Sequence, residues 1–353
     1  MIDQNYEDVH SELAVISVII PTKNEEKHIS KCIESLESSD YPKEKLDLIV
    51  IDGGSADKTV DLVEDLQRKY MNIRLFRHDG ANTSVGRNIG VKNSRGDIIF
   101  NFSSHALVEK GSLRILSTKL RNAAREVVGV GCKDRLPEDQ SSLVAVCIDS
   151  ITNTILGGKM MHQHATLKDE RYFDSISFTA YRKDLFEEIG YFDPALPAGD
   201  DAEFNLRIKE AGYKLLYTPE TCVYRYRREK LKSFFWQTFK YGRSRMQINK
   251  AHDNSIRLAY VVPLVFAVYM SVLVGLLFFG NLLLLIGWGL GFFIYFLVLL
   301  AFSLKLSFRE RKLSMLILCP LLYLTEHFAY GLGLLAGVVS VKRAMYDGDF
   351  GKE

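Results

Sequence analysis

Two adjacent carboxylates, Asp200 and Asp201, are the pair of side chains whose chemistry is easiest to define. Neighbouring acids repel each other's charge, which raises the pKa of one of them and suits it to accept a proton from a substrate hydroxyl. A structural role fits the same residues, because Asp200 followed by Glu203 three residues later matches the capping box that begins a helix. The residues themselves therefore predict either a general base or a helix cap.

Three other polar clusters lie at the ends of short apolar runs that are rich in β-branched residues. PTKNEE overlaps the end of the run at residues 14–21, DGGSAD follows residues 46–51, and SSHA follows residues 97–102. A further run covers 73–77, and segments with helical spacing lie at 26–37, 57–69 and 84–92. Strands that alternate with helices predict a doubly wound α/β sheet, in which ligands bind at the carboxyl ends of the strands. We expect the three polar clusters at that edge.

Some residues in and near these clusters have properties that a binding site could use. Gly53 and Gly54 allow close approach to the backbone, and the guanidinium of Arg87 can bind two phosphate oxygens at once. The imidazole of His105 suits Mn²⁺ better than Mg²⁺. Asn24, followed by two acids, is also a good helix N-cap, so part of this cluster has a purely structural interpretation.

Longer stretches resemble a known family. VIIPTKNEEKHISKCIESL, IVIDGGSADKTVDLV and SVGRNIGVKNSRGDIIF are similar to family 2 glycosyltransferases of the GT-A fold, and FTAYRKDLFEEIGYFDPALPAGDDAEFNLRIKEAGYKLLYTPE resembles their acceptor half. YRREKLKSFFWQTFKYGRSR resembles the membrane-associated members, especially the branch that assembles exopolysaccharides such as succinoglycan. The resemblance covers about residues 15–245. It implies an α/β nucleotide-diphospho-sugar transferase domain with a Rossmann-like mixed sheet.

The resemblance also implies a nucleotide-sugar site. It places the loop after the first strand along the nucleobase and ribose, Asp52 against the base, and Arg87 toward the phosphates. The residues that it assigns to the donor are Pro21, Thr22, Asn24, Glu25, Asp52, Gly54, Arg87 and Ser103. Asp57 is expected to cap the next helix instead.

A metal site is implied with one departure from the family pattern. The family carries Asp-x-Asp after the fourth strand, where carboxylates hold Mg²⁺ or Mn²⁺ against the diphosphate. In this sequence Ser103 replaces the first Asp and His105 the second. His105 is therefore the expected ligand of a divalent cation, but the missing negative charge puts the metal requirement in doubt. The alternative is that Ser103 and His105 only hydrogen-bond phosphate.

For catalysis, the resemblance implies inversion at the sugar, with Asp201 as the general base and Asp200 as its neighbour. Gln237, Arg243 and Arg245 resemble a Q-x-x-x-x-x-R arrangement near a diphosphate or a lipid phosphate. That spacing is looser than the Q-x-x-R-W of processive synthases, which disfavours a polymer synthase. Aromatic residues interleave with basic ones around these positions, as in a helix that lies in the lipid headgroup region.

The C-terminal third predicts a membrane. Residues 258–304 contain no Asp, Glu, Lys or Arg, and as helix they would measure about 70 Å, or about two crossings of a bilayer. A third apolar stretch, 313–341, is interrupted by Glu326 and His327. Nine Lys or Arg lie within residues 225–250, and the positive-inside rule then favours a re-entrant hairpin over a third crossing, because the latter would place Lys342 and Arg343 outside.

The predicted organisation divides the 353 residues into five parts. These are a tail (1–14), a GT-A catalytic domain (15–225), basic interfacial helices (226–257), transmembrane helices (258–279, 282–304 and 313–341) and a second tail (342–353). The acidic amino terminus predicts no secretory signal. We therefore expect an integral protein of the plasma membrane with its catalytic domain in the cytoplasm.

Composition excludes several other classes. With 47% apolar residues, 25% charged residues and a net charge of +2, the chain is neither disordered nor basic enough for a general nucleic-acid binder. The five cysteines, at 32, 132, 147, 222 and 319, show no metal spacing and are expected to be reduced. His162 and His164 predict a mobile acceptor loop rather than a metal pair.

Together these features predict an inverting glycosyltransferase that moves a sugar from a nucleotide-diphosphate donor to a membrane acceptor. The acceptor is expected to be a polyprenyl phosphate or a lipid-linked saccharide, in polysaccharide or glycoconjugate biosynthesis. One alternative is a polyprenyl-phosphate monosaccharide synthase, and another is a non-catalytic, nucleotide-sugar-binding membrane scaffold. The sugar, the base, the linkage and the presence of a homo-oligomer stay open.

Overall fold

The computed structural model describes residues 13–158, 167–252, 258–279 and 282–339. The alternation predicted for the first hundred residues is confirmed. It consists of β1 (Ile16–Thr22), α2 (Ile29–Glu37), η1 (Lys43–Lys45), β2 (Leu46–Asp52), α3 (Thr59–Lys69), β3 (Ile73–Arg77), α4 (Thr83–Lys92) and β4 (Ile98–Asn101). β1, β2 and β4 are buried along almost their whole length, which explains their β-branched, apolar composition.

The strands form one mixed sheet. Its order is β3-β2-β1-β4-β8-β6-β9-β5, and β7 also pairs with β9. The later strands are β5 (Ala106–Val108), β6 (Val127–Arg135), β7 (Arg171–Phe173), β8 (Thr179–Arg182) and β9 (Lys214–Arg225). β3, β2, β1 and β4 are parallel, whereas β8 is antiparallel to both β4 and β6. The doubly wound half thus joins a mixed half.

Helices cover both faces of this sheet. α5 (Ser112–Asn122) packs with α2 and α3 over one apolar core, and α4, α7 (Leu185–Ile189) and α8 (Asp200–Glu210) pack over the other. The contact of α4 with the sheet depends on a glycine, because a Cβ at Gly90 would overlap the side chain of Ile19. This close approach brings the residues of α4 down to the carboxyl edge of β1.

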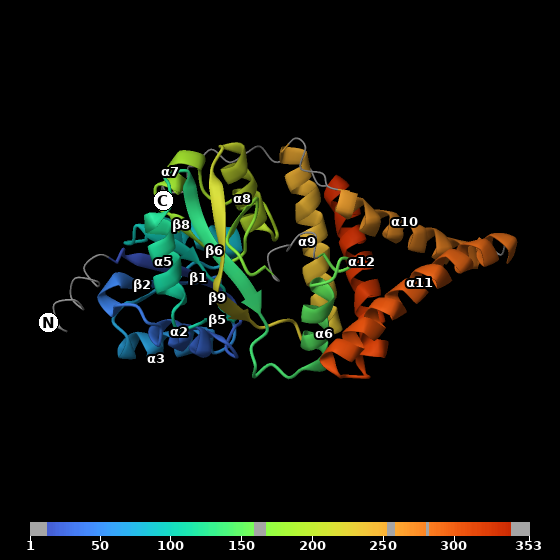
Figure 1. The fold of residues 1–353 in the computed structure, drawn as a ribbon, viewed down its shortest axis with the longest axis horizontal. Coiled ribbons are helices and arrows are strands. Elements are labelled where there is room, and N and C mark those ends of the chain that lie inside the picture. The colour runs from blue at the N-terminus through green and yellow to red at the C-terminus, as the bar shows by residue number, and fades with distance from the viewer. Residues whose placement is uncertain (1–12, 159–166, 253–257, 280–281, 340–353) are drawn as a thin grey trace.

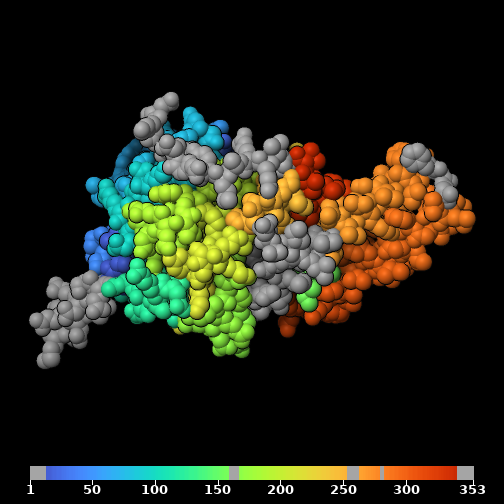
Figure 2. Space-filling view, turned by 90° about the horizontal axis from the view of Figure 1, so that it is seen from above, coloured from blue at the N-terminus to red at the C-terminus, as the bar shows by residue number. Residues whose placement is uncertain are grey.

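The remaining helices stand beside the sheet. They are α6 (Leu143–Thr152), α9 (Leu231–Ala251), α10 (Leu258–Phe279), α11 (Leu282–Glu310) and α12 (Met315–Val339). α10 and α11 project together away from the rest of the molecule, with α12 and then α9 between them and the sheet (Figure 1). From above, the same two helices extend well beyond the body of the protein (Figure 2).

Among the residues that the structure describes, two helices, α11 and α12, are long and apolar enough to cross a membrane. Only 6% of the most apolar part of α11 is buried inside the protein, against 50% for α12. α12 is also one continuous helix, so the hairpin break preferred at Glu326 and His327 is wrong. The reason is that other elements satisfy His327, which hydrogen-bonds with Tyr295 Oη at 2.5 Å and with the carbonyl oxygen of Leu156 at 2.8 Å.

Several predictions fall outside the described residues. They concern the histidines at 162 and 164, the basic pair Lys342 and Arg343, residues 1–12 of the first tail and the whole of the second tail.

Candidate active site

The loops after β1 and β2 are joined by hydrogen bonds. The backbone N–H of Asn24 donates to Ser55 Oγ at 2.8 Å, and the N–H of Ala56 donates to Asn24 Oδ1 at 2.8 Å. Asn24 adopts a left-handed conformation (φ 55°) that turns its amide toward the second loop. It therefore does not cap α2, which begins five residues later at Ile29. The two loops form one continuous wall at the carboxyl edge of the sheet.

Asp52 shapes the second loop from inside. Its side chain is buried, and its two oxygens accept hydrogen bonds from Gly54 N and Ser55 N at 3.0 Å and from Ser55 Oγ at 2.5 Å. A carboxylate has about four acceptor positions, so one remains for a ligand. Asp57 lies one residue before the N-cap position of α3, which Lys58 occupies, so it is not the cap that the sequence predicted. Its Oδ1 accepts a hydrogen bond from Thr59 N at 3.0 Å.

Ser103 and His105 follow β4 and lie beside Glu25 of the first loop. Glu25 Oε1 is 3.1 Å from His105 Nδ1, and Ser103 Oγ is 3.2 Å from each ring nitrogen. Burial raises the pKa of Glu25, but its hydrogen bond with His105 and the basic side chains around it lower the pKa by more, so the pKa falls overall. The sequence assigned Glu25 to the nucleotide, and the structure places it against the expected metal ligand.

The side chains around His105 include few ligands for a divalent cation. In the part of the chain that the structure describes, no group of three or more His, Cys, Asp or Glu side chains is placed to bind a metal. However, a metal-binding histidine usually gives its other ring N–H to a carboxylate, which is the relation between His105 and Glu25. The set of one imidazole, one hydroxyl and one supporting carboxylate fits a Mn²⁺-type ion that takes its other ligands from a diphosphate.

A second cluster joins α4 to α8. Arg87 Nη1 donates to Asp200 Oδ2 at 2.8 Å, and only 14% and 7% of these two side chains are exposed. The guanidinium also lies over the ring of Phe192, 5.4 Å from its centre. Burial, with the charge of Asp201, raises the pKa of Asp200 despite the opposing charge of Arg87. The two residues are 113 positions apart, and sequence analysis gave them separate roles.

Asp201 is the more accessible of the paired acids. α8 begins at Asp200 after Gly199, whose φ of 71° only glycine adopts easily, and no side chain caps this end. The capping box predicted from Asp200 and Glu203 is thus not formed. Asp200 turns to Arg87, and Glu203 pairs with Arg207 at 2.7 Å. Asp201 is only partly buried, and its Oδ1 accepts a hydrogen bond from Ala202 N at 2.9 Å.

The basic helix α9 borders this cluster. Ser244 Oγ accepts a hydrogen bond from Ala198 N at 3.1 Å, just before α8 begins. At about 100° per residue, Gln237 and Arg245 lie about 80° apart around α9, whereas Arg243 is about 120° from Gln237. Gln237 contacts Tyr241 at 3.5 Å. In an ideal helix Gln237 is therefore somewhat nearer to Arg245 than to Arg243 around the axis.

The remaining donor residues end β1. The ring of Pro21 lies beneath Gly86 of α4, and Thr22 pairs with Asp52 across the sheet. Thr22 is buried, and its hydroxyl has no hydrogen-bond partner. A residue that sequence analysis missed, Asn101 at the end of β4, is similar in both respects. Its only signal was a polar residue at the end of an apolar strand.

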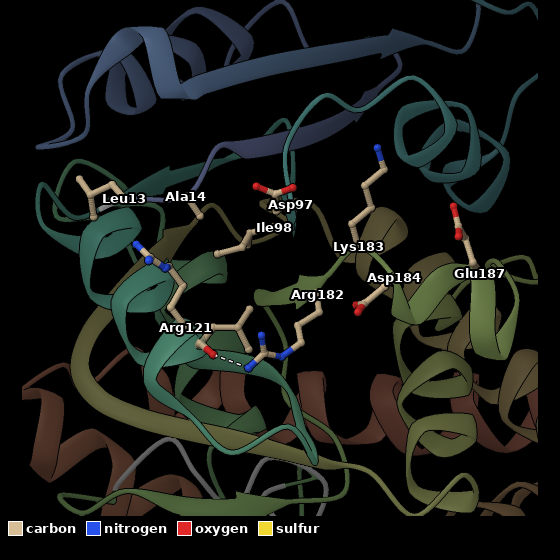
Figure 3. A pocket seen from close by; sticks show the side chains of 10 residues that line it. Leu13, Ala14, Asp97, Ile98, Arg121, Arg182, Lys183, Asp184 and Glu187 are labelled. Atoms are coloured by element: carbon tan, nitrogen blue, oxygen red, sulfur yellow. Dashed lines mark hydrogen bonds between the residues drawn. The ribbon is translucent and has the colours of Figure 1, made fainter. Parts of the chain in front are cut away.

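A cavity of about 620 Å³ lies elsewhere. Ala14, Asp97 and Arg182 are among the residues that line it, at the amino ends of β1 and β4 and the carboxyl end of β8 (Figure 3). Arg182 is held there by a hydrogen bond of 2.8 Å to the carbonyl oxygen of Leu120. Because the polar loops gather at the opposite edge of the parallel strands, this cavity is separate from the candidate site.

Comparisons with known proteins agree with this arrangement. The family model "Glycosyl transferase family 2" matches residues 17–190, and "Glycosyl transferase family group 2" matches residues 114–325. A relative from Methanococcus voltae, dolichyl N-acetyl-alpha-D-glucosaminyl phosphate 3-beta-D-2,3-diacetamido-2,3-dideoxy-beta-D-glucuronosyltransferase, is 31% identical over 92% of this chain and 97% of its own.

Two further proteins are informative. The succinoglycan biosynthesis protein ExoA of Rhizobium meliloti is 25% identical over 77% of this chain and 78% of its own. A mannosyltransferase from Pyrobaculum calidifontis, solved in complex with GDP-Man and Mn²⁺, shares the fold with a TM-score of 0.59 at 17% identity, over 88% of this chain and 87% of its own.

Proposed function

This chain belongs to the family 2 glycosyltransferases and has their GT-A fold, and we propose that it moves a sugar, with inversion, from a nucleotide-diphosphate donor to a lipid-linked acceptor. A polyprenyl phosphate or a lipid-linked saccharide is the acceptor class, in glycoconjugate or polysaccharide biosynthesis. The name of the Methanococcus voltae relative, which specifies a dolichyl-phosphate-linked substrate, supports this class. The observation that carries the proposal is the unequal environment of Asp200 and Asp201.

Arg87 separates the roles of the two acids. Its ion pair with Asp200 occupies that carboxylate, so Asp201 is left to act on an acceptor. In the transfer, an acceptor oxygen bonds to the anomeric carbon while the bond from that carbon to the diphosphate breaks. Where the acceptor is a saccharide hydroxyl, Asp201 takes its proton, whereas the oxygen of a phosphate acceptor is already ionised; in both cases the nucleoside diphosphate leaves. Asp200 holds the Arg87 guanidinium near the place where the diphosphate charge develops.

The donor lies, in this proposal, along the joined loops after β1 and β2. Pro21, Thr22, Asn24 and Gly54 form the wall, and the remaining acceptor position of Asp52 faces the base. Ser103 and His105 would hold a divalent cation, with Glu25 fixing the ring of His105. When bound, such an ion would neutralise the leaving diphosphate.

The helical part would hold the enzyme at its acceptor. Exposed apolar side chains cover α11, including Leu283, Leu290 and Phe293. α9, which contains Gln237, Arg243 and Arg245, lies between the sheet and the helices α10 to α12 (Figure 1). We propose that these three side chains meet headgroup phosphates. We place the protein in the plasma membrane, with residues 15–225 in the cytoplasm and residues 226–257 at the interface.

The test is a transfer assay on the full-length protein in nanodiscs. A panel of radiolabelled UDP- and GDP-sugars is offered with polyprenyl phosphate or with a lipid-linked saccharide, with and without Mn²⁺ or Mg²⁺. We expect a lipid-extractable product, and a loss of about 10²- to 10⁴-fold in kcat for Asp201→Asn. Glu187→Gln, an exposed acid on α7, is the matched control and should keep full activity.

Other outcomes select the alternatives. If Asp201→Asn keeps most of its activity on polyprenyl phosphate, the protein is a polyprenyl-phosphate monosaccharide synthase, because a phosphate acceptor needs no base. If the wild-type protein binds a nucleoside diphosphate but forms no product with any donor and acceptor, it is a binding scaffold and the proposed function is wrong.

A further inference from the structure

Asn101, the last residue of β4, has a buried amide without partners. The residue is 6% exposed, and neither Oδ1 nor Nδ2 forms a hydrogen bond. Buried polar groups in proteins are almost always hydrogen-bonded, because a buried amide that has lost its water and gained no partner destabilises the fold. The amide of Asn101 therefore lowers the stability of the fold.

Two other buried asparagines on the same face are fully satisfied. Asn88 of α4 donates to the carbonyl oxygen of Phe192 at 2.8 Å and accepts from Phe192 N at 2.9 Å. Asn205 of α8 accepts from Tyr181 Oη at 2.7 Å and donates to the carbonyl oxygen of Ile176 at 3.2 Å. The fold can thus satisfy a buried amide here, which makes Asn101 an exception that requires an explanation.

The position of Asn101 links it to the candidate site. It pairs with Ile19 across the parallel β1–β4 ladder, so both side chains lie on the face that α4 covers. Asn101 is the residue at the carboxyl end of its strand, two positions before Ser103. α4 also supplies Arg87, whose Nε is buried without a partner, and β1 ends at Thr22, whose hydroxyl is in the same state. Asn101 and Arg87 thus bring two unsatisfied groups to the face that α4 covers, whereas Thr22, three residues after Ile19 on β1, points to the opposite face.

The hydrogen-bonding groups of the amide indicate which part of a nucleotide-sugar donor it could bind. An amide offers one acceptor and two donors side by side. A phosphate only accepts hydrogen bonds, so it would satisfy Nδ2 and leave Oδ1 without a partner. A sugar hydroxyl, or the acylamino group of an amino sugar, can both donate and accept, and satisfies both ends.

We propose that Asn101 binds the sugar of the nucleotide-sugar donor and contributes to the choice of that sugar. This inference rests on the proposed function, since it requires a nucleotide-sugar donor at this edge. A site built to hydrogen-bond a substrate group discriminates strongly against a ligand that lacks it, because the buried protein group is then left unpaired.

Asn101→Leu tests the proposal with two measurements of opposite sign. The melting temperature should rise, because an apolar side chain of similar size replaces an unsatisfied amide. Calorimetry measures affinity for the nucleotide sugar that gives the fastest transfer in the assay above. This affinity should fall by about 10-fold or more. Affinity for the corresponding nucleoside diphosphate alone should not change, which separates sugar binding from phosphate binding. Asn101→Ala, which introduces no added bulk, should show the same loss.

Asn88→Leu is the matched control. The same substitution on the same face removes satisfied hydrogen bonds, so the melting temperature should fall. Equal affinities of wild type and both Asn101 variants for the nucleotide sugar would overturn the inference alone. A parallel loss of affinity for the nucleoside diphosphate would also overturn it, in favour of a phosphate contact. If the wild-type protein binds no nucleotide sugar, the proposed function fails together with the inference.

Discussion

The sheet half and the helical half of this protein are held together by different interactions. In the sheet half, the loops that form the site are fixed by directed polar contacts, such as Asn24 with Ser55 and Arg87 with Asp200. In the helical half, α12 lies against α9 through backbone contact, and a Cβ at Gly333 would overlap the carbonyl oxygen of Phe239. Polar contacts define where atoms stand for chemistry, whereas glycine contacts define only how closely two helices approach.

Breaking the buried ion pair should have the largest effect on stability. Arg87→Met leaves the buried carboxylate of Asp200 without its partner, and removing one member of a buried pair costs about 3–5 kcal/mol. Thermal unfolding in detergent measures this loss. In Arg87→Met/Asp200→Asn no charge is stranded, so most of the loss should be recovered. If the double variant is as unstable as the single one, packing rather than charge explains the loss.

The same variant has a predictable pH dependence. Burial already raises the pKa of Asp200 in the wild type, and without Arg87 this pKa rises further. The folded state of Arg87→Met then binds a proton more tightly than the unfolded state. The stabilisation that Asp200 contributes is therefore complete below the unfolded pKa of about 3.9 and is lost as the pH rises through the folded pKa. Thermal unfolding of both proteins as a function of pH should show the variant losing stability relative to the wild type over this range, and a relative gain would contradict the assignment.

Overpacking the glycine contact should have the next largest effect. Gly333→Leu forces α12 away from α9, and overpacking of this kind costs about 1–3 kcal/mol. Since α9 also contacts α8, where His252 Nδ1 lies 2.9 Å from Glu210 Oε2, transfer activity should fall with stability. Thermal unfolding and the lipid transfer assay measure the two effects. Unchanged stability would show that this helix pair is not closely packed.

Sequence analysis predicted the regular parts of the fold well. The first four strands and their helices follow from local periodicity, because each apolar run is short, β-branched and bounded by polar turns. For α12, apolar composition alone does not predict the surroundings of the helix. Its apolar composition predicts a membrane helix as that of α11 does, yet half of its most apolar part is covered by protein. Hydropathy records that a surface is hidden from water, and does not record whether lipid or protein hides it.

The candidate site was predicted as a set of residues but not as a set of contacts. Arg87 and Asp200 are 113 positions apart, and Glu25 and His105 are 80 apart. No periodicity connects such positions, so only the folded sheet shows that they pair. Asn101 was missed for a related reason, since its lack of partners is a property of its surroundings.

Loosening the joined loops should have a smaller effect. Asn24→Ala removes the acceptor for Ala56 N, and a hydrogen bond of this kind contributes about 0.5–1.5 kcal/mol. The loops should separate more easily, so KM for the donor should rise while kcat changes little. Asn24→Gly keeps the positive φ and loses the same bond, so it isolates the contribution of the amide. If Asn24→Gly behaves as wild type, the left-handed backbone and not the hydrogen bond holds the loops.

The smallest effect is expected from a glycine-to-leucine substitution in α11, Gly289→Leu, which matches Gly333→Leu in α12. No atom lies within 4 Å of the position of a Cβ at Gly289. Gly289→Leu therefore meets no steric obstacle, and the higher helix propensity of leucine should raise stability by up to about 1 kcal/mol. Thermal unfolding in nanodiscs, beside Gly333→Leu, measures the difference in sign. A loss as large as that of Gly333→Leu would mean that α11 packs against another surface in the membrane, such as a second copy of this chain. The exposed face of α11 would then be an interface. α11 would, like α12, be held by close packing.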